Sequence, residues 1–229
     1  WYSDSQTSGR FTVSAVKALK ARILLFDAYD SNGKAISSKM EEVLTLLQSI
    51  KGYSLAARVR DNFISEKQLA SPEIMFSVRF LRPNLTHSMD LYYGAWAVLD
   101  PTRNMVDAFE CTDGKPWGES PLTVRPDESI LYGNDDALKK AERAKMFMNR
   151  DRRLYESVNH SMMANFVDDG FKDEEVQVNE SNNKGPTGFS ALKYVQPTDV
   201  TPGYSTVSDA DIVVLRYAHV LLMIAEAEN

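Results

Sequence analysis

The chain has 229 residues and a net charge of −6, from 26 Lys and Arg against 32 Asp and Glu. This length can bury a core as one domain, and the acidic balance argues against a nucleic-acid binder, which needs a basic face. The single cysteine, Cys111, excludes an internal disulfide. The apolar stretches are helix-length at most and interrupted by charge, so no membrane span is predicted.

Residues 10–52 predict two helices joined by a turn. The first helix covers about residues 11–28, and the small Ala15 and Ala18 would let a neighbouring helix come close. One apolar stripe follows this helix: Val16, Leu19, Ile23 and Phe26. The inner face of the second helix, which ends before Gly52, comprises Met40, Val43, Leu44, Leu47 and Ile50. We therefore expect an αα-hairpin, the unit of a helical repeat.

The connection between these helices, around Asn32-Gly33, imitates the centre of a calcium-binding EF-hand loop. The first and twelfth positions of that loop would be Ala28 and Lys39, which supply no side-chain oxygen. The segment is interpreted as a plain turn.

Residues 72–136 lack regular patterning after a short alternating segment at 75–81 that predicts a strand. Proline and glycine punctuate the rest: Pro83, Gly94, Pro101, Gly114, Pro116, Gly118, Pro121, Pro126 and Gly133. So long an irregular segment is uncommon in a compact domain unless it carries function, and we expect a ligand site there. Residues 137–208 are expected to hold a further helix, at about 136–147, and loops.

Residues 209–229 predict a strongly apolar helix, with Ser208 and Asp209 as N-cap candidates. Its stripe has 4, 3, 4, 3 spacing: Val213, Tyr217, Val220, Ile224 and Ala227. A helix this apolar must be covered on more than one side. No stop signal follows it, so a partner helix is expected beyond it.

Catalytic motifs are scarce. The sequence has no His-Glu-x-x-His, phosphate-loop or nucleophile-elbow motif, and three histidines with one cysteine leave little material for a zinc site. We interpret His219 as a packed or hydrogen-bonded residue of the core helix. A carboxylate pair for glycoside hydrolysis could come from Asp107, Glu110 and Asp113, but a strand followed by an Asp113-Gly114 turn is the favoured interpretation.

The cluster Arg150-Asp151-Arg152-Arg153 is interpreted as structural. Asp151 between arginines favours ion pairing at a helix junction, and a phosphate site is disfavoured in so acidic a chain.

Aromatic residues in the irregular region are the remaining candidates for function. Sugars present C–H-rich faces, which flat apolar rings bind beside hydrogen-bonding groups. The candidate rings are Trp96, Tyr92, Tyr93, Trp117 and Tyr132. The candidate polar contacts are Arg82, Asn84, Asp90 and Asn104. Each ring alone could equally plug a local apolar cluster, but together on loops they favour a binding site.

Four ordered segments resemble the SusD/RagB family of outer-membrane nutrient-binding lipoproteins of Bacteroidetes. Residues 216–227, Arg-Tyr-Ala-His-Val-Leu-Leu-Met-Ile-Ala-Glu-Ala, resemble the family's signature helix. Residues 9–26 are similar to its tetratricopeptide helix, residues 149–155 to its Arg-Asp-Pro-Arg-Leu segment, and residues 185–194 to the strand before the signature helix. Arg152 stands where the family usually has Pro, and His219 where it often has Glu.

The resemblance implies a mainly α, tetratricopeptide-like fold with long loops and a few short strands, forming one domain fragment over residues 1–229. It implies a cell-surface protein that binds a glycan without enzymatic activity or cofactor, and delivers it to a SusC-like TonB-dependent transporter. The lipid anchor of the lipoprotein and a C-terminal portion are expected outside this sequence.

Three alternatives stay open. A peptide-binding, RagB-like nutrient receptor belongs to the same superfamily. A helical-repeat scaffold that docks a protein partner would bury the aromatic rings and use its concave helix faces. A glycosidase is the least favoured alternative.

Overall fold

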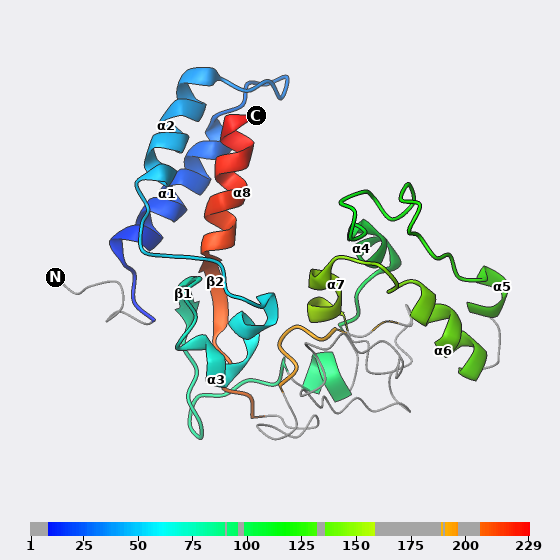
Figure 1. Ribbon diagram of the computed structural model, residues 1–229. Helices are drawn as coiled ribbons and strands as arrows, with labels where there is room; N and C mark the ends of the chain where they lie inside the picture. The colour runs from blue at the N-terminus through cyan, green and yellow to red at the C-terminus, as the bar shows by residue number, and fades with distance from the viewer. Residues whose placement is uncertain are drawn as a thin grey trace. The chain divides into compact units, whose positions relative to one another are not determined.

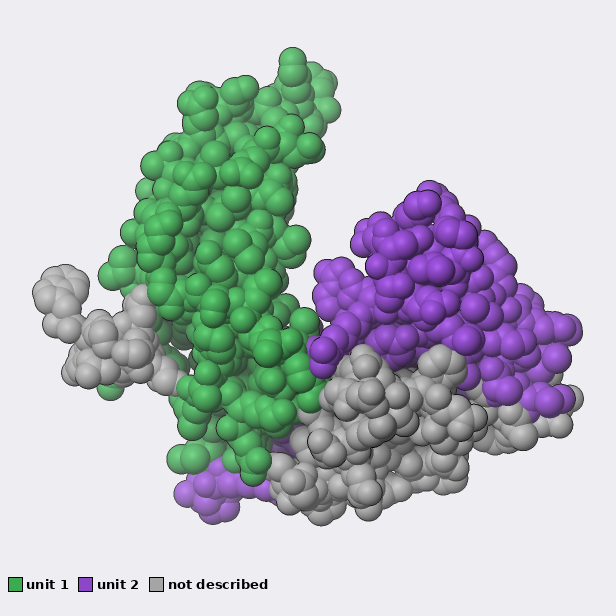
Figure 2. Space-filling model, viewed as in Figure 1, with its two compact units in different colours: residues 1–81, 209–229 green, residues 82–208 purple. Residues whose placement is uncertain are grey.

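A computed structural model describes residues 9–89, 91–95, 99–131, 136–158, 189, 191–196 and 207–229. The chain groups into two compact units, coloured separately in Figure 2: unit 1 comprises residues 1–81 and 209–229, and unit 2 comprises residues 82–208. Helices dominate the described residues, as predicted. Within this part of the chain, every helix is too short or too polar to cross a lipid bilayer.

Unit 1 begins with the predicted helical hairpin, α1 (Val13–Asp27) and α2 (Ser37–Gln48). The Thr12 hydroxyl caps α1 by accepting a hydrogen bond from the Ala15 amide at 3.0 Å. The connection is the predicted turn: an Asp30 carboxylate oxygen accepts from the amides of Asn32 and Lys34 at 2.8 and 2.9 Å, and Gly33 has a φ of +76°.

The hairpin packs through the small residues of α1. Its buried side chains include Ala15, Ala18, Ala21 and Leu25. They meet the predicted inner face of α2, where Met40, Val43 and Leu47 are buried, and Ile50 is buried just beyond the end of α2. The larger apolar stripe of α1 faces solvent instead: Val16, Leu19, Ile23 and Phe26 are 53%, 39%, 63% and 80% exposed. Small side chains allow the helices a short interaxial distance, and this close approach decides which face of α1 is buried.

The closing segment differs from the prediction of one helix over residues 209–229. Its first part is a strand, β2 (Ile212–Arg216), and the helix α8 starts only at Tyr217 and ends at Glu228. Strand β2 pairs antiparallel with β1 (Ile74–Val78), the strand predicted near residues 75–81. The β-branched run Ile212-Val-Val explains the strand, because such side chains fit a pleated surface. Figure 1 shows β2 leading directly into α8, which packs beside α1 and α2.

A buried carboxylate joins the sheet to the loop that follows the hairpin, which contains η2 (Val59–Phe63) and α3 (Ser65–Gln68). Glu73, 2% exposed, accepts from Arg216 Nη1 at 2.6 Å, from the Asn62 side-chain amide at 2.9 Å and from the Ala56 backbone amide at 3.0 Å. The Glu73 carbonyl also accepts from the Tyr217 amide at 2.9 Å. Glu73 therefore fixes the loop, the sheet and the start of α8 together.

Unit 2 contains a turn of π-helix at Leu91–Ala95 and four helices, α4 (Arg103–Ala108), α5 (Glu128–Leu131), α6 (Asp136–Lys145) and α7 (Arg152–Ser157), among its described residues. Helix α6 confirms the helix predicted near 136–147. The core of the unit comprises Val106, Cys111, Trp117, Leu131, Met146, Phe147, Leu154, Val158 and Phe189. The description of residues 1–229 as one domain stays a prediction.

Candidate ligand-binding region

The segment that carries the first predicted aromatic residues is held at its base by a two-way backbone bridge. The His87 amide donates to the Ser208 carbonyl at 2.9 Å, and the Ser208 amide donates to the His87 carbonyl at 2.9 Å. His87 Nδ1 accepts from the Met89 amide at 3.2 Å. Ser208, proposed from sequence as a helix cap, is thus completely buried as a partner of this loop.

The loop then turns through Leu91–Ala95 and presents two tyrosines. Leu91 is 6% exposed and anchors the turn, Tyr92 is 40% exposed, and Tyr93 is half-buried. An exposed ring on an anchored turn is suited to stack on a ligand. Trp96, Tyr132 and Asp90 lie outside the described residues.

Polar candidates on both sides of this turn differ in exposure. Arg82 is half-buried, whereas Asn84 and Asn104 are exposed. Asp100, which sequence reasoning passed over, is half-buried, and burial raises the pKa of its carboxyl group to about 6. Neither carboxylate oxygen of Asp100 has a hydrogen-bond partner among the described residues. No signal in the sequence identifies this acid, because its missing hydrogen-bond partners appear only in the folded structure.

Trp117 occupies a different environment from Tyr92. It is 5% exposed and belongs to the core of unit 2. Three guanidinium groups surround its ring, with Cζ atoms at 5.2 Å for Arg150, 5.4 Å for Arg125 and 5.6 Å for Arg103 from the ring centroid. This burial favours the interpretation of Trp117 as a core residue that anchors its loop. The role of Trp117 in ligand stacking stays a prediction.

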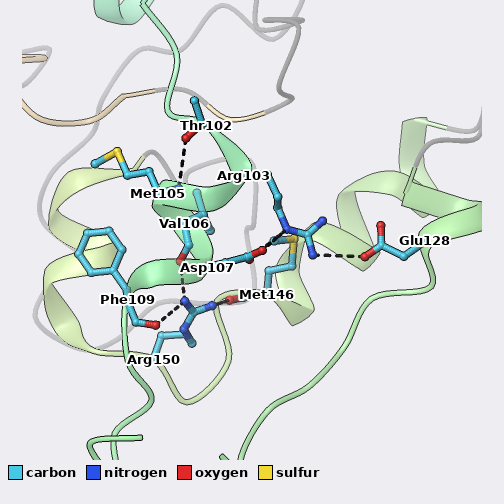
Figure 3. Close-up of polar contacts among 9 residues, drawn as sticks. All are labelled: Thr102, Arg103, Met105, Val106, Asp107, Phe109, Glu128, Met146 and Arg150. Atoms are coloured by element: carbon cyan, nitrogen blue, oxygen red, sulfur yellow. Dashed lines mark hydrogen bonds and ion pairs between the residues drawn. The ribbon is translucent and has the colours of Figure 1, made fainter. Parts of the chain in front are cut away.

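Arg150 is the central hydrogen-bond donor to the backbone around the ends of α4 and α6 (Figure 3). Only 1% exposed, it donates from Nη1 to the Met146 carbonyl at 2.6 Å and from Nη2 to the carbonyls of Val106 and Phe109 at 2.6 and 2.7 Å. Carbonyls at the ends of α4 and α6 lack partners within their helices, so a cation is well placed there. Burial lowers the pKa of the guanidinium group.

Two of the three carboxylates considered for glycoside hydrolysis, Asp107 and Asp113, have their own partners. Asp107 lies on α4, not on the expected strand, and accepts from Arg103 Nε at 3.0 and 2.9 Å, while Arg103 also contacts Glu128 at 3.2 Å (Figure 3). Asp113 accepts from the Ser120 hydroxyl at 2.9 Å, and Gly114 has a φ of +76° in the predicted Asp-Gly turn. Both acids stabilise local structure.

The structural interpretation of Asp151 is confirmed. Its carboxylate caps α7 by accepting from the Arg153 amide at 2.7 Å and forms a bidentate pair with the Arg153 guanidinium group. These bonds from Arg153 hold the pKa of Asp151 below its usual value. Among the described residues, no group of three or more His, Cys, Asp or Glu side chains could hold a metal ion.

The hairpin and α8 define a helical, tetratricopeptide-like class of protein, with unit 2 supplying irregular loops. The SusD family model matches residues 70–229, more than half of the chain, and the chain belongs to the SusD family.

Solved structures agree with this fold. The chain is similar to a SusD-like carbohydrate-binding protein of Bacteroides fragilis NCTC 9343, with a TM-score of 0.62 and 19% identity over 96% of this chain and 40% of that one. It is also similar to NanU of B. fragilis, with a TM-score of 0.50 and 19% identity over 97% of this chain and 41% of that one. A third similar structure is surface glycan-binding protein A of Bacteroides thetaiotaomicron in complex with laminarihexaose, with a TM-score of 0.50 and 17% identity over 99% of this chain and 45% of that one.

The chain thus spans less than half the length of these three proteins. No curated protein gives a significant match.

Proposed function

We propose that the protein binds a glycan at the cell surface through the loops of unit 2. Membership of the SusD family over residues 70–229 carries this proposal. Two of the similar structures are named as carbohydrate- or glycan-binding proteins, one of them in complex with laminarihexaose. The RagB-like, peptide-binding alternative has no comparable support.

Within unit 2, the loop around residues 91–96 is the proposed platform. Tyr92 offers an exposed ring on a turn whose base is fixed by the His87–Ser208 bridge and by buried Leu91. Tyr93 and Trp96 follow in the same segment and would extend the stacking surface along a sugar chain.

Polar groups beside these rings would orient the sugar. Arg82, Asn84 and Asp90 are the contacts proposed from sequence, and Tyr132 is a further ring of the same proposal. We leave Asp100 out of the platform, because both of its carboxylate oxygens are enclosed by the fold and a sugar hydroxyl could not reach them. Trp117 would support the site as an anchor for its loop.

The proposed activity is binding without covalent chemistry, so no cofactor is needed. Asp107 pairs with Arg103 and Asp113 with Ser120, and neither acid is presented as a member of a hydrolytic carboxylate pair. The protein would act as an outer-membrane lipoprotein and pass its glycan to a SusC-like TonB-dependent transporter. Co-purification of that transporter with the anchored protein from native outer membranes tests this step.

Binding is tested by titrating the purified chain with a panel of oligosaccharides and a panel of oligopeptides. Tyr92→Ala should weaken glycan binding about tenfold, the loss expected for one stacked ring. Tyr29→Ala is the matched control, because Tyr29 is 36% exposed in unit 1, close to the 40% of Tyr92. Preference for oligopeptides would favour a RagB-like receptor, and glycan binding that is unchanged in both Tyr92→Ala and Trp96→Ala would refute the proposed platform.

A further inference from the structure

The turn between α1 and α2 contains the one Asn-Gly pair of the sequence, Asn32-Gly33. Both residues are exposed, and Gly33 has a φ of +76°. Asn is among the thermolabile residues, and a following Gly has no Cβ to keep its amide nitrogen away from the Asn side chain. This pair therefore brings a nucleophile and an electrophile together in neighbouring residues.

Asp30 holds the turn in a conformation that does not react. One Asp30 carboxylate oxygen accepts from the amides of Asn32 and Lys34 at 2.8 and 2.9 Å, and the Asp30 carbonyl accepts from the Gly33 amide at 3.0 Å. The Gly33 N–H is thus directed at Asp30, whereas the reaction needs the Gly33 nitrogen to approach Asn32 Cγ. The turn must open locally before Asn32 reacts.

The side chain of Asn32 can take part as soon as the turn opens. Its amide group has no hydrogen-bond partner among the described residues. The comparable pair Asp113-Gly114 has its acid fixed at both oxygens, because Oδ1 accepts from the Lys115 amide at 3.2 Å and Oδ2 from the Ser120 hydroxyl at 2.9 Å. Of these two turns, the one at Asn32 has the side chain that is free to rotate.

We propose that Asn32 is a site of spontaneous deamidation, at a rate limited by the hydrogen bonds from Asp30. In the open turn, the Gly33 nitrogen gives up its proton and bonds to Asn32 Cγ, and the Cγ–Nδ2 bond breaks as Nδ2 takes up a proton and leaves as ammonia. Water then adds to one of the two carbonyls of the resulting succinimide ring. Cleavage of the new bond leaves aspartate at position 32, and cleavage of the original peptide bond leaves isoaspartate.

Isoaspartate would change the connection between the two helices, because its main chain runs through the side chain and is one carbon longer. The bonds on either side of it join the Asp30 amide to the Lys34 carbonyl at 2.9 Å and the Ile36 amide to the Ala28 carbonyl at 2.8 Å. The longer connection would loosen this pairing, and the new carboxylate would repel that of Asp30. This site lies in unit 1 and does not depend on glycan binding by unit 2.

Peptide mass mapping of the purified 229-residue chain, sampled during incubation at neutral and mildly alkaline pH, measures the reaction. Conversion gives the peptide the mass difference between an amide and a carboxyl group, and fragmentation at position 32 distinguishes isoaspartate from aspartate. The internal controls are two exposed asparagines followed by larger residues, Asn84 and Asn104. Asn32 should convert at least about tenfold faster than either control, into both products. The rate should rise with pH, because the attacking nitrogen must lose its proton.

Gly33→Ala tests the attack by the Gly33 nitrogen. The added methyl group stands beside this nitrogen and should slow the conversion of Asn32 by at least about tenfold. The new Cβ would meet no other atom within 4 Å, so the variant should fold despite the φ of +76°.

Asp30→Ala tests the hydrogen bonds that keep the turn closed. Loss of the carboxylate should speed the conversion of Asn32 about threefold to tenfold and accelerate hydrogen exchange at the Asn32 and Gly33 amides. The matched control is Asp27→Ala, at an acid of the same hairpin that contacts Lys39 at 2.6 Å. This control should leave the conversion rate unchanged.

Conversion of Asn32 no faster than that of Asn84 and Asn104 would overturn the proposal. Aspartate formed without isoaspartate, or an unchanged rate in Gly33→Ala, would exclude the succinimide route. A conversion rate or an amide exchange rate that Asp30→Ala leaves unchanged or lowers would overturn the role of Asp30.

Discussion

Replacing Glu73 with Gln removes one charge from the buried hydrogen-bond network around Glu73 in unit 1 and keeps the size of the side chain. Glu73 is 2% exposed, and its partner Arg216 has a side chain that is 16% exposed, with its guanidinium carbon 5.4 Å from the centroid of the Phe63 ring. The variant therefore leaves Arg216 as a largely buried cation without its counter-ion. The amide nitrogen of Gln also cannot accept a hydrogen bond, so one of the donors from Asn62, Ala56 and Arg216 loses its acceptor.

We expect this change to lower the free energy of unfolding by about 3 kcal/mol, because breaking a buried ion pair from one side costs about 3–5 kcal/mol and the Gln carbonyl retains part of the hydrogen bonding. Combining Glu73→Gln with Arg216→Met removes both charges. The double variant should be more stable than the sum of the single variants predicts, by about 1–2 kcal/mol.

Urea unfolding followed by circular dichroism measures these free energies, provided that the denaturant slope is unchanged. The control is Lys67→Gln, which breaks an ion pair to Asp61 whose side chains are 45% and 25% exposed and should cost less than about 1 kcal/mol. If Glu73→Gln costs no more than this control, or if the free-energy changes of the two single variants simply add in the double variant, the buried Glu73–Arg216 ion pair does not have the stabilising role assigned to it.

Three further predictions concern unit 2. Arg150→Lys should cost about 2–4 kcal/mol in thermal or urea unfolding, because one ammonium cannot reach the three carbonyls that the guanidinium group holds, and a loss below about 1 kcal/mol would contradict that role. Asp151→Ala should cost about 1 kcal/mol through loss of the α7 cap, and since the pKa of Asp151 is lowered, this cost should shrink as pH falls below about 4. For Asp100 the sign is reversed: its pKa is raised from 3.8 to about 6, so the folded state binds the proton more tightly and ionisation destabilises it as pH rises from about 4 to 6. Asp100→Asn should therefore stabilise the protein by about 1–2 kcal/mol at pH 7.5, less than for a fully buried acid, and by nothing at pH 4, and the opposite pH trend in unfolding experiments would refute the assignment.

The parts of the fold that depend on local signals could be predicted from the sequence. The helical hairpin has clear turn chemistry at Asp30 and Gly33, and α6 has a helical pattern bounded by loops. Strand β2 could not be predicted in the same way, because the run from Ile212 to Leu215 fits both a helical stripe and a strand. Its pairing with β1, far away in the sequence, decides between the two.

The buried face of α1 could not be predicted from the sequence for a similar reason. Sequence periodicity identifies the largest apolar stripe, at Val16, Leu19, Ile23 and Phe26, whereas packing against α2 selects the alanines.

The sequence predicts the region of the candidate site better than it predicts the role of each residue in it. Tyr92 and Trp117 both follow the composition expected of ligand-binding rings on loops, each with a glycine close by. Trp117 is enclosed by guanidinium groups from Arg103, Arg125 and Arg150, which lie on other segments, while Tyr92 remains exposed. Only contacts between segments that are distant in the sequence distinguish Trp117, which anchors its loop, from Tyr92, which stays exposed. Asp100 was missed because its lack of partners appears only when the folded surroundings are known.

The central claim is that this SusD-family chain binds a glycan through the loop around Tyr92. Isothermal titration with an oligosaccharide panel that includes laminarihexaose, a ligand of one structural relative, tests it most directly. We expect saturable binding of at least one oligosaccharide, weakened about tenfold by Tyr92→Ala and unchanged by Tyr29→Ala. Binding of oligopeptides in preference to every oligosaccharide, or glycan binding indifferent to both Tyr92→Ala and Trp96→Ala, would contradict it.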